Sequence, residues 1–210
     1  MLIRAFIKNF LSFNEETILS LYPGKGPETR HTIRGRGRDD IPVLKTAVVY
    51  GANASGKSNL VKAIAFMKQF VTQGFPAPSG IDYQPFKLAT SALDNSKIEF
   101  EIKVNNAYFA YGVDFNSEQV VEEWLVRLNK RTEQTIYHRK NLKDSVKVDF
   151  DKVRFLDKDD EQFARFTGRG TPRNRLFILE AYRRNLNFIE EINEVFSWFS
   201  NQLKVLFPKS

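Results

Sequence analysis

Residues 51–58 read Gly-Ala-Asn-Ala-Ser-Gly-Lys-Ser, which matches the pattern G-x-x-x-x-G-K-[ST] in full. This is the pattern of a phosphate-binding loop, because glycines at both positions let the backbone turn its amides toward a phosphate. Lys57 is expected to reach the β- and γ-phosphates of a nucleotide, and the Ser58 hydroxyl is expected to ligate Mg²⁺. The sequence therefore predicts a nucleotide site at Gly51, Ala52, Asn53, Ala54, Ser55, Gly56, Lys57, Ser58 and Asn59.

Both flanks of this stretch favour the same interpretation. Upstream, Thr46–Tyr50 is a short apolar, β-branched run of the kind that forms a buried strand. Downstream, residues 58–71 lack Gly and Pro, and their apolar residues recur at helical spacing. When a strand is followed by a glycine turn and then by a helix, the positive end of the helix dipole points at the phosphate. The sequence therefore predicts strand, loop and helix in this order.

Composition limits the classes of protein that remain. The chain has 210 residues, of which 42% are hydrophobic, so it can bury a sizeable core. It contains no cysteine, which excludes disulfides and thiolate metal sites. No apolar run reaches the length of a membrane span, and the charged N-terminus does not resemble a signal peptide. We therefore expect a cytoplasmic protein without a membrane partner.

The net charge of +7 favours a polyanionic partner. Basic residues gather in a Gly- and Pro-containing stretch from Tyr22 to Pro42, which predicts a long basic loop. Within it, Arg34, Arg36 and Arg38 are candidates for contacts to the backbone of DNA or RNA. The alternative is a solvated loop that binds nothing. The two histidines, His31 and His138, are too few and too far apart in sequence to indicate a metal centre.

The rest of the chain is predicted to form strands followed by helices. Two N-terminal strands are expected at 2–10 and 17–21, and an antiparallel meander of four strands at 98–104, 108–115, 120–128 and 135–138. The last quarter predicts helical segments at 157–166, at 173–184 and from about 189 to 203, with a break at 168–172. The fold class is thus α/β.

Together these stretches resemble the N-terminal part of an ABC-type ATPase head, the group of the chromosome-maintenance, RecF-like and overcoming-lysogenization-defect ATPases. The resemblance is nearest to the prokaryotic AAA family ATPases of abortive-infection, Septu and retron defence. It rests on the following stretches: Ile7–Phe13, Gly51–Asn59, Pro85–Leu88, Glu99–Ile102, Tyr111–Val113, Glu123–Leu125, Asn174–Phe177 and Trp198–Phe199. One departure is Leu11, which stands where many relatives carry a basic residue.

The resemblance implies a P-loop NTPase half-domain that binds ATP and Mg²⁺. It divides the chain into N-terminal strands and P-loop helix (1–75), a β-lobe (76–150) and a helical part (151–210). The signature Ser-Gly loop and the strand ending in Asp-Glu that such heads need are not found, although Val153–Asp157 faintly imitates that strand. We therefore expect the second half of the head to be absent, and the catalytic residues are unknown. The chain is expected to bind ATP without turning it over.

The resemblance also implies partners. These are a second copy or the missing ATPase half, and an effector nuclease that the ATPase regulates as a sensor linked to nucleic acid. We expect Phe196, Phe199, Leu203 and Phe207 to lie against the missing half.

Three alternatives remain open at this point. The chain could be a non-hydrolysing module that uses ATP to dock a partner protein. It could be a GTPase, since Asn129-Lys130-Arg131-Thr132 begins like a guanine-reading motif but lacks its Asp. A small-molecule kinase is the third, and the β-meander argues against it.

Overall fold

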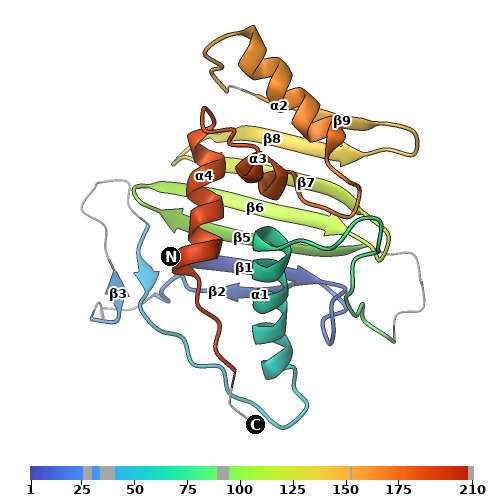
Figure 1. The fold of residues 1–210 in the computed structure, drawn as a ribbon. Helices are drawn as coiled ribbons and strands as arrows, with labels where there is room; N and C mark the ends of the chain where they lie inside the picture. The colour runs from blue at the N-terminus through green and yellow to red at the C-terminus, as the bar shows by residue number, and fades with distance from the viewer. Residues whose placement is uncertain (26–29, 34–40, 89–94, 152, 208–210) are drawn as a thin grey trace.

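The computed structural model describes residues 1–25, 30–33, 41–88, 95–151 and 153–207. Its main feature is a seven-stranded antiparallel sheet with strand order β2-β1-β5-β6-β7-β8-β9 (Figure 1). The strands are β1 Leu2–Lys8, β2 Thr17–Ser20, β5 Ser96–Val104, β6 Ala107–Phe115, β7 Val120–Leu128, β8 Glu133–Asn141 and β9 Val146–Asp149. Two short strands, β3 Thr32–Ile33 and β4 Val43–Leu44, pair with each other apart from this sheet.

The strands of the meander form because apolar and polar residues alternate along them. In β5, Ile98, Phe100 and Ile102 are fully buried, and Glu99 between them lies on the other face. Asn105 makes the turn into β6 with φ 51°, a left-handed conformation that Asn tolerates well. The predicted meander is confirmed. The structure adds β9 as a fifth strand, and β1 pairs with β5, so the N-terminal strands and the meander form one sheet.

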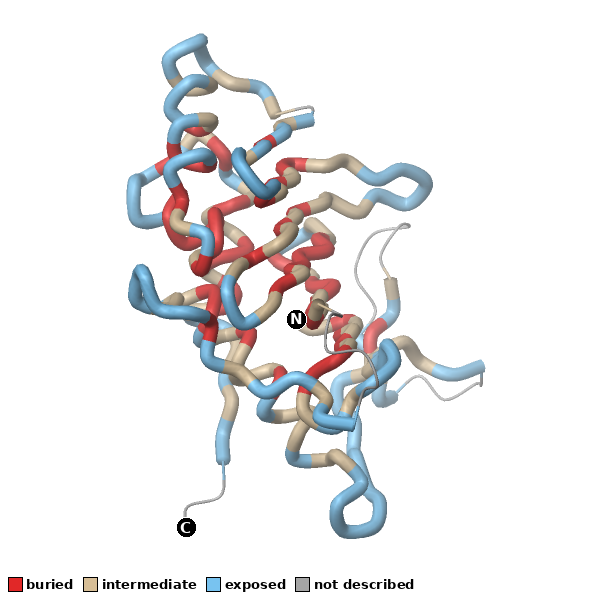
Figure 2. Tube along the Cα trace, turned by 90° about the vertical axis from the view of Figure 1, so that its right-hand side faces the viewer, coloured by how far each residue is buried: buried red, intermediate tan, exposed pale blue. Residues whose placement is uncertain are grey.

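The helices α1 Lys57–Thr72, α3 Phe177–Arg183 and α4 Glu190–Ser197 lie on one face of the sheet, and α2 Lys158–Gly170 packs beside β9 (Figure 1). The predicted helix after the loop is confirmed: α1 buries Ala63, Met67, Phe70 and Val71. Phe66 of this helix contacts Phe115 of β6, with ring centroids 5.4 Å apart. Buried residues therefore fill the space between the sheet and the helices (Figure 2).

The C-terminal quarter differs from the prediction in three places. The break in helical structure that was predicted at 168–172 begins later in the chain, because α2 continues to Gly170. A Cβ atom on Gly168 would lie 2.6 Å from Val148 of β9, so a glycine here lets the helix approach the strand. The second predicted helix, 173–184, begins only at Phe177, and a π-helical turn, Trp198–Gln202, follows α4 in the third.

The expectation that Phe196 and Phe199 lie against a missing half is wrong. Phe199 is fully buried against Phe100 and Tyr111, and the ring of Phe196 stacks on Tyr182 with centroids 3.8 Å apart. These rings are part of the core of the chain itself. Leu203 is half-buried, and of the four predicted residues only Phe207 is exposed.

The prediction of a buried strand at Thr46–Tyr50 is also wrong. All five residues are exposed and lie outside both sheets, in the connection that runs from β4 down to α1 (Figure 1). A strand is buried only when neighbours pair with it, and the described residues supply no neighbouring strand. In the predicted basic loop, Thr32–Ile33 form β3, whereas residues 26–29 and 34–40 lie outside the described residues.

None of the described helices combines the length and the apolar character that crossing a membrane would require.

Candidate nucleotide-binding site

The phosphate-binding loop leads directly into α1. Gly56 caps the helix with φ 91° and ψ 0°, and Ala54 also has a positive φ of 64°. Left-handed conformations of this kind turn successive amides to one side, which makes a concave surface for an anion. The first turn of α1 contains no acidic residue, so the positive end of the helix dipole is not neutralised there.

The loop lies close to two serine side chains. A Cβ atom on Gly51 would lie 2.9 Å from the Ser55 Oγ atom, and one on Gly56 would lie 2.8 Å from the Ser12 Oγ atom. Rotation of either serine would relieve its contact, but at Gly56 the φ of 91° itself favours glycine. The residues present therefore fit a phosphate group that is bound by backbone amides at close range.

Lys57 lies over the mouth of this loop. Its Nζ atom donates to the carbonyl oxygens of Gly51 at 2.7 Å and of Ala52 at 2.6 Å, and lies 3.4 Å from the Ser55 Oγ atom. The ammonium group is thus held within the loop, close to where a phosphate would be bound.

Ser58 is exposed in the first turn of α1, where its hydroxyl could ligate a Mg²⁺ ion that also binds phosphate oxygens and water. No Asp or Glu occurs anywhere from Ile41 to Ile81, whereas that stretch holds Lys45, Lys57, Lys62 and Lys68. Among the residues that the structure describes, no group of three or more His, Asp or Glu side chains could hold a metal ion. This side of the site therefore offers phosphate-binding groups but no carboxylate.

A hollow of about 340 Å³ lies beside the loop. Its lining comes from the turn after β1, from α1 and from the segment before β5: Leu11, Ser12, Asn59, Lys62, Gln84, Pro85, Phe86, Lys87 and Leu88. The Leu11 amide donates to the Gln84 carbonyl at 2.8 Å, and the Phe86 amide donates to the Asn9 Oδ1 atom at 3.1 Å. These bonds hold the turn after β1 against the segment before β5. Sequence reasoning did not assign Gln84 or Lys62 to the site.

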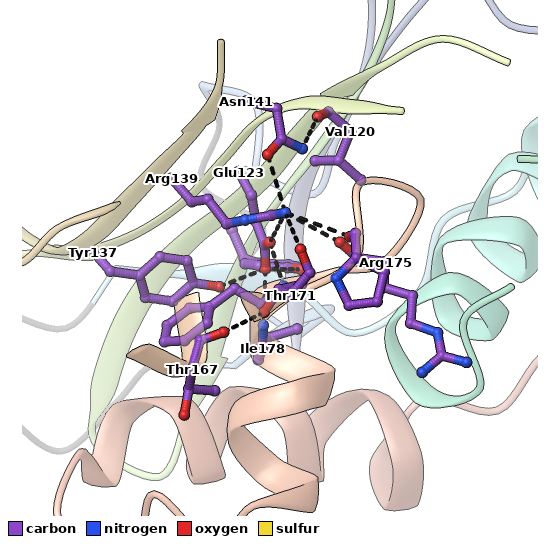
Figure 3. Close-up of polar contacts among 12 residues, drawn as sticks. Val120, Glu123, Tyr137, Arg139, Asn141, Thr167, Thr171, Arg175 and Ile178 are labelled. Atoms are coloured by element: carbon purple, nitrogen blue, oxygen red, sulfur yellow. Dashed lines mark hydrogen bonds and ion pairs between the residues drawn. The ribbon is translucent and has the colours of Figure 1, made fainter. Parts of the chain in front are cut away.

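A second group of polar residues lies buried between the sheet and α3 (Figure 3). The Glu123 carboxylate on β7 is fully buried and accepts hydrogen bonds from the Tyr111 hydroxyl at 3.1 Å and the Tyr137 hydroxyl at 2.8 Å. It also accepts from the amides of Phe177 at 2.5 Å and Ile178 at 3.0 Å. Burial, and then the nearby Glu123 charge, raise the pKa of Tyr111 and Tyr137 well above the usual value, so both phenols remain donors.

Arg139 supplies the positive charge that pairs with Glu123, and its side chain is also fully buried. Its Nη1 atom lies 3.9 Å from the Glu123 Oε2 atom. The guanidinium donates to Asn141 Oδ1 at 3.1 Å, to the Thr171 carbonyl at 3.0 Å and to the Arg175 carbonyl at 3.1 Å. Burial lowers the pKa of Arg139, although the guanidinium stays charged. We call Tyr111, Glu123, Tyr137 and Arg139 the buried polar cluster; it binds the segment before α3 to the sheet.

The same segment also holds the end of α1. Arg175 Nε donates to the Phe75 carbonyl at 3.1 Å, and Asn174 Nδ2 donates to the Pro76 carbonyl at 2.8 Å. The helix that carries the phosphate-binding loop at its start is therefore fixed at its end by residues that the buried polar cluster positions. Sequence reasoning missed this group, because a buried Glu or Arg in a strand cannot be told from an exposed one by local sequence.

The other predicted candidates lie either outside the described residues or in the sheet and its turns. Arg34, Arg36 and Arg38 lie outside the described residues, so nucleic-acid binding stays a prediction. Asn129 starts the turn between β7 and β8, where its amide donates to the Thr132 carbonyl at 2.9 Å. The His138 Nε2 atom lies 2.9 Å from the Glu122 Oε2 atom in a cross-strand pair.

Comparison with protein-family profiles matches residues 47–205 to a family of AAA domains whose description names the AbiEii toxin and type IV toxin–antitoxin systems. The matched range covers the loop, the meander and the C-terminal helices. No curated protein matches the chain.

Proposed function

The chain belongs to this family of AAA domains, and we propose from that premise that it is the ATP-binding portion of an ABC-type ATPase. One observation carries the proposal: the loop 51–58 is shaped by Gly56 at φ 91° on the first turn of α1, with the Lys57 ammonium held over it. Membership in the family makes nucleotide binding the expected use of such a loop. The ligands in this proposal are ATP bound by residues 51–59 and Mg²⁺ ligated by Ser58.

The proposal extends to the wider role of the chain. The family description names a toxin of a toxin–antitoxin system, which supports a place in prokaryotic defence. In this proposal the ATPase controls an effector nuclease, and ATP hydrolysis requires a carboxylate from outside these 210 residues. The lack of an apolar strand ending in Asp-Glu in this sequence supports that requirement, because that motif supplies the water-activating carboxylate in the ATPase heads that the chain resembles.

Calorimetric titration of the chain with ATP in the presence of Mg²⁺ tests nucleotide binding. Lys57→Ala removes a charge-assisted contact to phosphate worth about 1.5–3 kcal/mol, so the Kd is expected to rise about 10- to 150-fold. Lys147→Ala is the matched control, because Lys147 is an exposed lysine on β9 that pairs with Asp149. Absence of ATP binding, or equal affinity in wild type and Lys57→Ala, would contradict the proposal.

A second candidate is a nucleotide-dependent module that docks a partner protein and never hydrolyses ATP. The lack of a strand ending in Asp-Glu in this sequence favours it equally well. Both candidates predict negligible ATP turnover by the purified chain, measured at steady state with Lys57→Ala as the control for contaminating ATPases. Sustained hydrolysis that depends on Lys57 would mean that a catalytic carboxylate exists within these residues.

A further inference from the structure

Glu180 on α3 holds three arginines near the end of α1. Only 9% of its side chain is exposed. Its Oε1 atom accepts a hydrogen bond from Arg175 Nη1 at 3.1 Å and lies 3.6 Å from Arg183 Nη1, and its Oε2 atom lies 3.9 Å from Arg184 Nε. One nearly buried carboxylate therefore selects the direction in which these long, flexible side chains extend. We call Glu180, Arg175 and Arg183 the arginine clamp.

The two arginines of the clamp bind the C-terminal end of α1. Arg175 extends away from the buried polar cluster, and its Nε atom donates to the Phe75 carbonyl at 3.1 Å (Figure 3). Arg183 Nη2 donates to the Gln73 carbonyl at 3.2 Å. The last turn of α1 contains no basic residue, so the clamp supplies the positive charge that the negative end of a helix dipole attracts.

The other end of α1, which carries the phosphate-binding loop, is held less firmly. The buried residues of α1 begin at Ala63, so none lies in its first six residues, 57–62, and residues 51–55 of the loop are all exposed. A helix of 16 residues spans about 24 Å and moves nearly as a rigid rod. A change in the direction of α1 at the clamp therefore displaces the loop at its other end.

We propose that Glu180 is a positioning residue of the nucleotide site. By directing Arg175 and Arg183 onto the end of α1, it sets the orientation in which the phosphate-binding loop binds ATP. The inference rests on the proposed function and deepens it, because it makes the affinity for ATP depend on ion pairs at the end of α1 that lies away from the loop. A clamp with a structural role alone would change stability and leave the affinity of the folded chain as it is.

Arg183→Ala and Arg184→Ala form a matched pair for the test. Both side chains are about half-exposed, at 45% and 52%, and both pair with Glu180. Within the described part of the chain, only the first of the two also bonds to the end of α1. We expect the Kd for ATP with Mg²⁺, measured by calorimetric titration of folded protein, to rise about 2- to 30-fold for Arg183→Ala. It should stay unchanged for Arg184→Ala.

Glu180→Gln removes the charge that directs both arginines, so its Kd should rise at least as far as that of Arg183→Ala. Once Glu180 is replaced, Arg183→Ala should add little, a coupling that independent structural effects would not give. Glu161→Gln is the control, because Glu161 pairs with Arg165 within α2 and should not affect the Kd. If Glu180→Gln does not fold, the half-exposed Arg183 still carries the test.

A measurement without nucleotide separates this proposal from the proposed function. Because the chain contains no cysteine, spin labels can be attached specifically at Lys62→Cys on α1 and Lys147→Cys on β9, which are both exposed positions. Electron paramagnetic resonance then gives the distribution of distances between the labels. Glu180→Gln and Arg183→Ala should shift or broaden this distribution, and Arg184→Ala should leave it unchanged.

The proposal is overturned if the wild type binds ATP and folded Glu180→Gln and Arg183→Ala bind it equally well. It is also overturned if Arg184→Ala raises the Kd as much as Arg183→Ala does. If the wild type itself binds no ATP, the proposed function fails. The distances between the spin labels then decide whether the clamp orients α1, and unchanged distances in Glu180→Gln and Arg183→Ala would show that it does not.

Discussion

Replacing Glu123 by Gln tests whether the buried polar cluster holds the helical layer on the sheet. Gln has nearly the same shape as Glu but no charge, so the substitution leaves Arg139 buried without its counter-ion. It also presents an amide NH₂ group where four donors, from Tyr111, Tyr137, Phe177 and Ile178, now point at an acceptor.

Two independent routes give the size of the effect. A hydrogen bond to a charged group contributes about 1 kcal/mol more than one between neutral groups, so four such bonds lose about 4 kcal/mol. Removal of one partner of a buried ion pair costs about 3–5 kcal/mol, a range that includes the value from the hydrogen bonds. For a chain of this size each kcal/mol lowers the melting temperature by about 2–4 °C, so we expect a fall of about 8–16 °C.

Urea and thermal unfolding, followed by circular dichroism, measure this change. Glu122→Gln is the matched control, because Glu122 lies next in sequence but is half-exposed and pairs with His138 and Lys140. That substitution should cost less than about 1 kcal/mol. A loss for Glu123→Gln no larger than that for Glu122→Gln would refute the reasoning. The reasoning would also be refuted if the losses in free energy of unfolding for Glu123→Gln and Arg139→Leu simply added in the double variant, because coupled residues deviate from additivity.

Two further predictions concern the sheet and the N-terminus. Gly112→Ala would place a Cβ atom 2.2 Å from the Trp124 ring and displace the indole from its 2.8 Å bond to Glu99. We expect the free energy of unfolding, measured in urea, to fall by about 1–3 kcal/mol. The fluorescence emission of Trp124 should also shift. Gly170→Ala, where nothing lies within 4 Å, should be near neutral, and equal effects would contradict this account. Burial, followed by the Lys103 charge, lowers the pKa of the Met1 amine from 8.0 to about 6. Between these values the unfolded chain binds more protons, so the free energy of unfolding should rise with pH in that window. N-terminal acetylation should flatten the rise, and an unchanged pH profile in the acetylated chain would exclude the amine as its cause.

Elements with a strong local pattern could be predicted from the sequence. The loop 51–58, helix α1 and the strands β5 to β7 are each specified by residues within their own length. The strand β9 was missed because four residues with Lys147 among them give little periodicity. Strand β8 was predicted too short, since Arg139 and Asn141 do not look like inward-facing strand residues.

The errors share a physical cause, which is dependence on distant partners. Thr46–Tyr50 has the composition of a buried strand, but burial requires neighbours that local composition does not report. Phe196 and Phe199 were predicted to lie at an interface, and they are in the core because β5 and β6 offer Phe100 and Tyr111 opposite Phe199. The partners of Glu123 come from three other elements, β6, β8 and α3, so no window of sequence contains them.

The pairing of β1 with β5 has a consequence for the order in which the protein is made. The two strands meet across about a hundred residues, and the Met1 amine donates to the Lys103 carbonyl at the end of that span. During synthesis, β1 and β2 emerge first but have no sheet to join until β5 has left the ribosome. The strands β6 to β9, by contrast, each directly follow in sequence a strand with which they pair. Helix α1 and its loop therefore lie in the long chain segment between β1 and β5, whose ends come together only when these two strands pair. A ribosome pause before Val104 would leave the nucleotide loop synthesised but not yet supported by the complete sheet.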